Sequence, residues 1–265
     1  MILFILEGKT ERRIVDTLKH LYFSDKEEEI VYFFENNIYQ LYDALIRDYG
    51  DFSNINGSVD LFAILKKKHP DSDLSKVKKV SDISEIFLFF DYDFQHAYQI
   101  KEQHPERELA DIIHEDDNKL QQMFSYFNEE TDKGMLFINY PMSEALFYTK
   151  ELPDLNYNQY QVTLEKCRHG LFKRLTDEHT TYKGQAGLLI SHPRDIVKAH
   201  NNWEHLRAQN LKKAYFLCWG KDELPHNYEV VSQDRVFHAE MKYYDKTQHI
   251  SILSSIPLFV FYYFK

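Results

Sequence analysis

The sequence predicts an α/β protein built on a doubly wound parallel sheet, and three observations support this prediction. Short apolar runs recur along the chain, at 2–6, at 30–34 within the segment 28–36, at 86–90 and at 135–139. These runs are continuous rather than alternating, which is typical of strands buried on both faces of a parallel sheet. The segments between them carry apolar residues at helical spacing. Alternation of strands and helices through residues 1–150 therefore indicates a parallel sheet covered by helices.

The predicted elements follow in chain order. After the strand at 2–6 we expect a helix with Thr10 as its N-cap and an apolar stripe that runs to about Tyr22. The later expectations are a strand at 28–36, helices at 37–49 and 59–69 separated by an Asn56-Gly57 turn, a strand at 86–90, a charged helical stretch at 104–130, a strand at 135–139 and a helix opened by Ser143 with Glu144 in its first turn. The acidic residues Glu115, Asp116 and Asp117 are expected to interrupt the charged stretch.

These elements suggest two parts. Residues 1–150 are expected to form the α/β domain, with a helical insert at about 35–80. Residues 151–265 are expected to form a mainly helical region packed on it. The apolar C-terminal segment 250–265 is interpreted as a buried helix with Pro257 near its first turn, or as a strand.

Composition limits the functions that fit this chain. Of its 265 residues 43% are hydrophobic and 15% are aromatic, which is enough for a sizeable core, and with only 8 Gly and 7 Pro long disordered segments are not expected. The formal net charge is −10, whereas proteins that depend mainly on phosphate contacts are usually basic. Nucleic-acid binding would therefore need a local patch, a metal site or a partner.

The sequence also favours a cytoplasmic protein without a membrane anchor. Cys167 and Cys218 form no metal-binding or redox motif, which fits a reducing compartment. The N-terminal run MILFIL is too short for a signal peptide and lacks a basic start. The C-terminal apolar segment is divided by Pro257 and is shorter than the ~20 residues that span a membrane.

Acidic residues follow three of the predicted buried strands. Glu7 follows the first strand, Asp91 and Asp93 follow the strand at 86–90, and Glu144 follows the strand at 135–139. In open α/β sheets, ligands bind at the carboxyl ends of the strands. Neighbouring carboxylates beside buried strands repel one another unless a cation compensates them, and Mg²⁺ prefers oxygen ligands. Gly8 would allow a sharp turn after Glu7 and the close approach of a substrate.

The motifs that carry these acids resemble those of the TOPRIM family. The segments EGKTE (7–11) and DYD (91–93), each after a buried strand, are similar to its metal-binding motifs. NYPMSEAL (139–146) is similar to the Pro-x-x-Glu helix start of TOPRIM nucleases in OLD-type and PARIS-type antiphage effectors. The resemblance covers roughly residues 1–150, although the region 35–80 is longer than a minimal TOPRIM core.

This resemblance implies a function and a set of site residues. It implies that Glu7, Asp91 and Asp93 bind Mg²⁺ or Mn²⁺ and that Glu144 binds a second ion or supports the first. It implies a nuclease that cleaves RNA, tRNA included, or DNA, as a toxic effector of an antiphage system. An ABC-type ATPase partner is expected because such effectors often work with one and this chain has no ATPase motif. The resemblance also allows a homodimer.

Several residues near the motifs have two interpretations. Lys9 is interpreted either as a contact for a substrate phosphate or as a solvated lysine in a turn. Glu11 is interpreted as a favourable charge at a helix N-terminus. His96 is an acid–base group or ligand, or an ordinary structural histidine. Several basic segments are interpreted either as contacts for nucleic acid or as solvated faces: 165–175, 210–216, and the residues Lys183, His192 and Arg194.

Two other functions remain open. In the first, the chain is a non-catalytic interaction module whose acidic cluster is a docking surface or a structural ion site. In the second, it transfers phosphoryl groups on nucleotides. EGKT lacks the glycines of a phosphate-binding loop, which weighs against a nucleotide site.

Overall fold

The computed structural model describes residues 1–23, 29–34, 37–52, 61–68, 74, 77, 79–168, 170–182 and 196–264. The chain divides into two compact units. The first unit comprises Met1–Arg12 and Ser24–Phe137, and the second comprises Arg13–Phe23 and Ile138–Lys265. Residues 13–23 and 138–150 thus belong to the second unit, whereas a single boundary at 150 is expected from the sequence.

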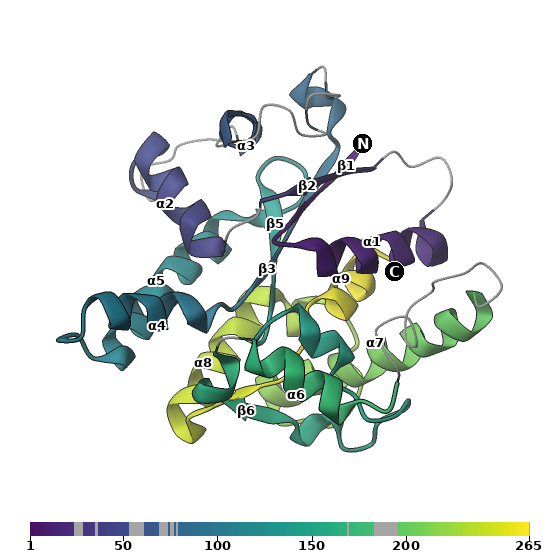
Figure 1. Cartoon of the computed structure of the whole chain (residues 1–265). Coiled ribbons are helices and arrows are strands. Elements are labelled where there is room, and N and C mark those ends of the chain that lie inside the picture. Colours follow the sequence, from purple (N-terminus) through teal and green to yellow (C-terminus); the bar gives the residue numbers. More distant parts are fainter. Residues whose placement is uncertain are drawn as a thin grey trace. The chain divides into compact units, whose positions relative to one another are not determined.

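The first unit is built on a five-stranded sheet (Figure 1). Its strands are β1 (Ile2–Leu6), β2 (Glu29–Phe33), β3 (Glu85–Asp91), β4 (Asn128–Glu129) and β5 (Gly134–Asn139), in the order β2-β1-β3-β5-β4. β1 pairs in parallel with β2 and with β3, while β4 pairs with β5 in antiparallel fashion. The predicted α/β class is therefore confirmed, with a mixed sheet in which most strands are parallel.

The segments that connect the strands of the sheet are mostly helical. They form α1 (Lys9–Tyr22), α2 (Ile38–Tyr49), α3 (Leu61–Lys68), the 3-10 turn η3 (Val80–Asp82), α4 (Phe94–Gln103) and α5 (Leu109–Tyr126). Helices α1, α2 and α4 begin within a few residues of the end of the preceding strand. α5 packs against α4 and α2, and these three helices lie together in Figure 1. α1 begins before Thr10, so the predicted N-cap lies in the first turn. The Asn56-Gly57 turn lies outside the described residues.

The predicted interruption at Glu115, Asp116 and Asp117 is wrong, because α5 continues through all three. The chain breaks instead at 104–108, between α4 and α5. Each acid has a partner that offsets the repulsion: Arg107 for Glu115, His96 and Lys119 for Asp116, and the Tyr92 hydroxyl for Asp117. The helix therefore tolerates a run of charge that would destabilise it in isolation.

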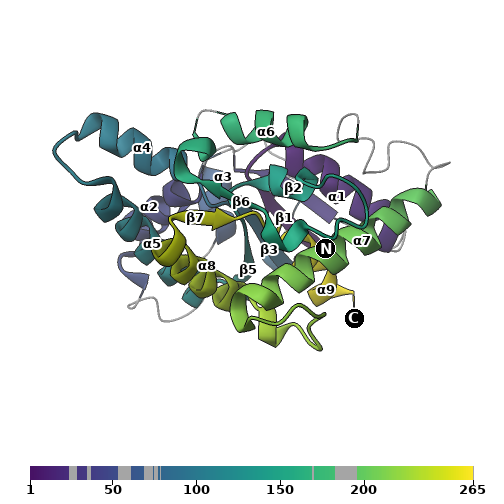
Figure 2. The same cartoon turned by 90° about the horizontal axis from the view of Figure 1, so that it is seen from below.

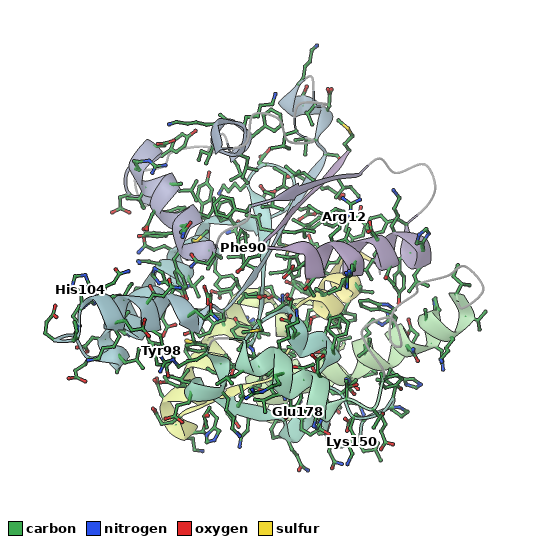
Figure 3. All side chains as sticks on the ribbon, in the orientation of Figure 1. Arg12, Phe90, Tyr98, His104, Lys150 and Glu178 are labelled. Atoms are coloured by element: carbon green, nitrogen blue, oxygen red, sulfur yellow. The ribbon has the colours of Figure 1, made fainter. Side chains whose placement is uncertain are left out.

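Aromatic rings from three strands form the core of the first unit. Phe4 on β1 stacks on Phe87 of β3 at 5.9 Å between ring centroids, and Phe89 stacks on Phe137 of β5 at 5.2 Å. All four side chains are buried, and the neighbouring Phe90 lies on β3 in Figure 3. Burial of each such ring contributes about 2–3 kcal/mol, which fixes the strands in register.

The second unit is formed mostly by helices. From Ile138 onward its elements are η4 (Ser143–Phe147), η5 (Tyr157–Gln159), β6 (Gln161–Thr163), η6 (Leu164–Cys167), α6 (Leu171–His179), α7 (Ile196–Trp219), η9 (Glu229–Val231), α8 (Gln233–Thr247), β7 (His249–Ser251) and α9 (Ile256–Tyr263). β6 and β7 form a short antiparallel pair next to α8 (Figure 2). α9 carries Pro257 in its first turn, so the helical interpretation of the C-terminal segment is confirmed from Ile256 onward, whereas Ile250 and Ser251 belong to the strand β7. Nowhere in the described ranges is a helix both long and apolar enough to span a membrane.

A buried ionisable pair lies in the core of the second unit. Lys213 donates hydrogen bonds to the carbonyl oxygens of Tyr157, at 3.0 Å, and Tyr160, and Glu240 accepts one from the Ser251 N–H. Burial lowers the pKa of Lys213 to about 7 and raises the pKa of Glu240 to about 8, although the charge of each opposes the shift of the other. Desolvation therefore outweighs their attraction.

We expect Lys213→Met to lower the free energy of unfolding by about 3 kcal/mol, because it leaves two buried carbonyls and Glu240 without this partner. Denaturant titration followed by circular dichroism measures the effect. The matched control is Lys212→Met, since Lys212 is the exposed neighbour on the same helix. Equal stability of the two variants would contradict a supporting role for Lys213.

Candidate functional site

Glu7 and Asp91 lie together at one edge of the sheet. Glu7 directly follows β1, and Asp91 is the last residue of β3. Because β1 and β3 are parallel, with Leu6 opposite Phe89, both strands end at the same edge. The Asp91 N–H donates a hydrogen bond to Glu7 Oε2 at 3.0 Å. The structure thus brings together two acids that are 84 residues apart in the chain.

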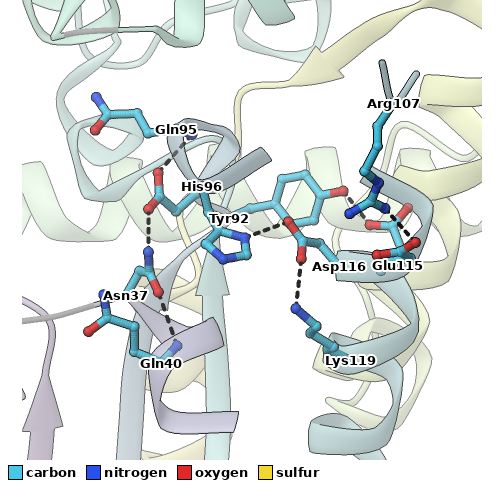
Figure 4. A network of polar contacts seen from close by, with 11 residues as sticks. Asn37, Gln40, Tyr92, Gln95, His96, Arg107, Glu115, Asp116 and Lys119 are labelled. Carbon is cyan, nitrogen blue, oxygen red and sulfur yellow. Dashed lines mark hydrogen bonds and ion pairs between the residues drawn. The ribbon is translucent and has the colours of Figure 1, made fainter. Parts of the chain in front are cut away.

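Asp93 is the N-cap of α4. Its Oδ1 accepts a hydrogen bond from the Gln95 N–H at 2.9 Å, and its Oδ2 accepts one from Asn37 Nδ2 at 3.1 Å (Figure 4). Burial raises the pKa of Asp93, while the bonds from Gln95 and Asn37 act in the opposite direction. Both oxygens therefore already serve the local fold.

Asn37 links two helix starts. Its Oδ1 accepts a hydrogen bond from the Gln40 N–H at 3.1 Å and so caps α2, while its Nδ2 binds Asp93. Asn37 is not among the site residues predicted from the sequence. Its position directly before an amphipathic helix indicates an N-cap, but only the fold reveals the contact with Asp93.

His96 belongs to a polar network between α4 and α5. Its Nδ1 lies 2.8 Å from Asp116 Oδ2, and Lys119 Nζ lies 3.3 Å from Asp116 Oδ1 (Figure 4). Its ring stacks on Tyr39 at 4.5 Å between centroids. These contacts give His96 a structural role, and Asp116 was missed because its segment was interpreted as a helix break.

The residues after Glu7 close the start of α1. Glu11 is buried, and its Oε2 accepts a hydrogen bond from the Gly8 N–H at 3.2 Å, which supports the helix-start interpretation. Gly8 does not adopt a positive φ, and a Cβ at this position would lie 3.5 Å from Glu11 Oε2, an ordinary contact. The backbone turn thus does not require glycine. Lys9 is the first residue of α1, and its side chain lies outside the described part of the structure.

Glu144 lies in the second unit. It occupies the first turn of η4, as expected, although η4 is a 3-10 helix opened by Ser143. Glu144 is 8% exposed; its Oε1 lies 3.9 Å from Lys173 Nζ, and its Oε2 accepts a weak hydrogen bond from Ser143 Oγ at 3.4 Å. It therefore has a cationic neighbour within its own unit. Lys183, His192 and Arg194 lie outside the described residues.

The donor chemistry at the sheet edge fits a hard divalent cation. Glu7 and Asp91 supply carboxylate oxygens at adjoining strand ends, and Mg²⁺ is commonly held by one or two carboxylates with water. Across the ranges that the structure describes, no three His, Cys, Asp or Glu side chains form a group that could hold an ion by themselves. Water or substrate oxygens would have to complete the coordination.

Comparisons with known proteins give no further guidance. The sequence matches no family model, and neither a curated protein nor a solved structure is significantly similar to the chain. Functional proposals for this protein therefore depend on its own residues and their geometry, together with the motif resemblance.

We expect Asn37→Ala to lower the free energy of unfolding by about 1–2 kcal/mol, because it removes a helix cap and a donor to Asp93. Asn37→Ser is the matched control, since serine keeps a capping oxygen but its side chain is too short to reach Asp93. Denaturant titration should rank the wild type above Asn37→Ser and Asn37→Ser above Asn37→Ala. Wild-type stability of both variants would show that neither bond matters.

Proposed function

We propose that this chain is a Mg²⁺-dependent nuclease of the TOPRIM type that cleaves phosphodiester bonds in RNA or DNA. Glu7, Asp91 and Asp93 would hold the cation, and Glu144 would assist as a further ligand or supporting group. The role of a toxic effector in antiphage defence, with tRNA among its substrates and an ABC-type ATPase as its partner, belongs to the same proposal and derives from the resemblance.

One observation carries this proposal. The carboxylate of Glu7 and the end of β3 meet at the carboxyl edge of adjacent parallel strands, joined by the bond from the Asp91 N–H. Ligand sites of open α/β sheets lie at this edge. Two separate motifs of the resemblance, EGKTE and DYD, are the segments that meet there.

Hydrogen bonds from neighbouring groups would orient the carboxylates for metal binding. The bond from Asp91 orients the Glu7 carboxylate, and the bonds from Asn37 and Gln95 fix Asp93 in a single orientation. Orientation of this kind reduces the reorganisation needed when a ligand binds. A bound Mg²⁺ would supply Lewis acidity toward a phosphodiester.

The non-catalytic interaction module is the second candidate, and Asp93 favours it. Both oxygens of Asp93 are engaged by neutral N–H donors, as expected of a helix cap that has only a structural role. Calorimetry with Mn²⁺ addresses this candidate. Binding that is lost in Asp91→Asn would exclude a bare docking surface, and cleavage assays would then distinguish a structural ion from a catalytic one.

We expect Glu7→Gln to reduce metal-dependent cleavage by about 100-fold or more while leaving stability nearly unchanged. The amide oxygen of glutamine can still accept the Asp91 N–H bond, so this contact is kept while the negative charge is lost. Loss of groups that merely support a ligand already costs about 10–100-fold. Labelled RNA and DNA incubated with Mg²⁺ or Mn²⁺ provide the assay. The control is Glu85→Gln, the same change at the opposite end of β3.

The same pair of variants can be compared in growing cells. Growth arrest and fragmentation of RNA or DNA with the wild type and Glu85→Gln, but not with Glu7→Gln, would support the proposal and identify the substrate. Full cleavage activity of purified Glu7→Gln would refute it.

Gly8→Ala tests whether a substrate approaches the backbone after β1. We expect stability within about 0.5 kcal/mol of the wild type, because the added Cβ meets no closer atom than Glu11 Oε2 at 3.5 Å. If a phosphate lies against Gly8, cleavage should nevertheless fall by about tenfold through a higher KM. Unchanged kinetics would show that the substrate stays away from this glycine.

A further inference from the structure

The second unit carries a strip of basic residues that would not hold the proposed metal ion; Lys166, Lys173 and Arg174 are exposed, while Arg168 is half-buried. We call the set Lys166, Arg168, Lys173 and Arg174 the basic strip. Lys166 belongs to η6, Arg168 follows it, and Lys173 and Arg174 lie on α6, which packs against η6. No acidic residue occurs between Lys166 and Arg174, although the whole chain has a net charge of −10.

The fold holds the charged ends of Lys173 and Arg174 in solvent. Phe172 and Thr176 anchor α6 through its buried face, and Phe172 stacks on Tyr148 at 5.6 Å between ring centroids. The side chains of Lys173 and Arg174 are 58% and 68% exposed. Because Phe172 is buried, the aromatic residue of this stretch serves packing. The basic strip thus offers charge rather than a surface for stacking bases.

The stability of α6 does not explain these charges. Lys173 and Arg174 lie in its first turn, and Asp177 and Glu178 lie in its last; Figure 3 labels Glu178 on this helix. A helix is stabilised by the opposite arrangement, with acids at the N-terminus and bases at the C-terminus. Arg174 also precedes its ion-pair partner Glu178 by four residues, at 3.9 Å, which is the less favourable order for such a pair.

Lys173 connects the basic strip to a predicted site residue. Its Nζ lies 3.9 Å from Glu144 Oε1 while the rest of its side chain is mostly exposed. At 3.9 Å, with the lysine in solvent, this ion pair is long and partly screened, although the Glu144 side chain is only 11% exposed. A phosphate of a polyanion can therefore compete with Glu144 for Lys173.

We infer that the basic strip binds the phosphate backbone of a nucleic acid and that Lys173 holds one phosphate beside Glu144. The identity of this polyanion rests on the proposed nuclease function. RNA and DNA share the chemistry that the strip recognises, which is a row of phosphates without base contacts. Binding should accordingly be insensitive to sequence and strongly weakened by salt.

The experiment measures binding separately from cleavage. Fluorescence anisotropy with labelled RNA, single-stranded DNA and duplex DNA is carried out with Glu7→Gln protein, across a series of salt concentrations. Lys173→Ala/Arg174→Ala is added to that background and should raise Kd about tenfold. It should also reduce the slope of log K against log salt by about 1–2 units, since each lost phosphate contact contributes about 0.7–0.9. The polymer most affected identifies the natural backbone.

Lys221→Ala is the matched control, because Lys221 is also 58% exposed and also lies near a glutamate, Glu223, at 3.8 Å. We expect it to change Kd less than twofold, and Lys173→Arg should retain most of the affinity of the parent protein. Circular dichroism checks the fold of every variant. An unchanged Kd and slope in the double variant, or an equal loss in Lys221→Ala, would overturn the inference.

Cleavage by the wild type decides the proposed function independently. If the wild type cleaves in a metal-dependent way but binding does not depend on the basic strip, the binding role of the strip is wrong and the nuclease proposal stands. If binding depends on the basic strip but no metal supports cleavage, the binding role of the strip is supported and the nuclease proposal is wrong.

Discussion

The parallel pairing of β1 with β3 is the constraint on which the candidate site depends. Both strands contain a continuous apolar run, and rings on their shared face fix the register with Leu6 opposite Phe89. A slip of one residue would turn these rings to the other face, so the core resists it. The contact between Glu7 and Asp91 follows directly from that register. The site is thus positioned by hydrophobic packing rather than by attraction between its polar groups.

Features that depend on local pattern could be predicted from the sequence, and features that depend on distant partners could not. The strands at 2–6 and 135–139 have unbroken apolar runs that exclude most other structures. The acidic run that starts at Glu115 was misread because its partners lie elsewhere; His96, for example, is 20 residues from Asp116. A charge pattern shows where repulsion exists but not what compensates it, and compensation decides whether a helix continues.

Asp93 shows why structural and catalytic roles are hard to separate at this sheet edge. Loss of a capping aspartate alone costs about 1 kcal/mol, so an inactive Asp93 variant could be merely a less stable one. Carboxylate oxygens have further lone pairs, so capping by itself does not prevent metal binding. Glu7 differs, because the hydrogen bond that it accepts from the Asp91 N–H survives replacement by glutamine. Its negative charge can therefore be removed while this contact is kept.

An acidic protein that binds a polyanion repels it over a longer distance than its local basic residues attract it. Repulsion from a net charge of −10 is screened within about 8 Å at physiological salt but extends to about 30 Å at 0.01 M. A few exposed cations, such as Lys173 and Arg174, act at contact distance, where screening is weak. Lowering the salt strengthens their contacts with phosphate but also lengthens the reach of the protein's overall repulsion. Local basic charge on an acidic chain therefore directs a polyanion to the surface that carries this charge, where attraction at contact distance exceeds the screened repulsion.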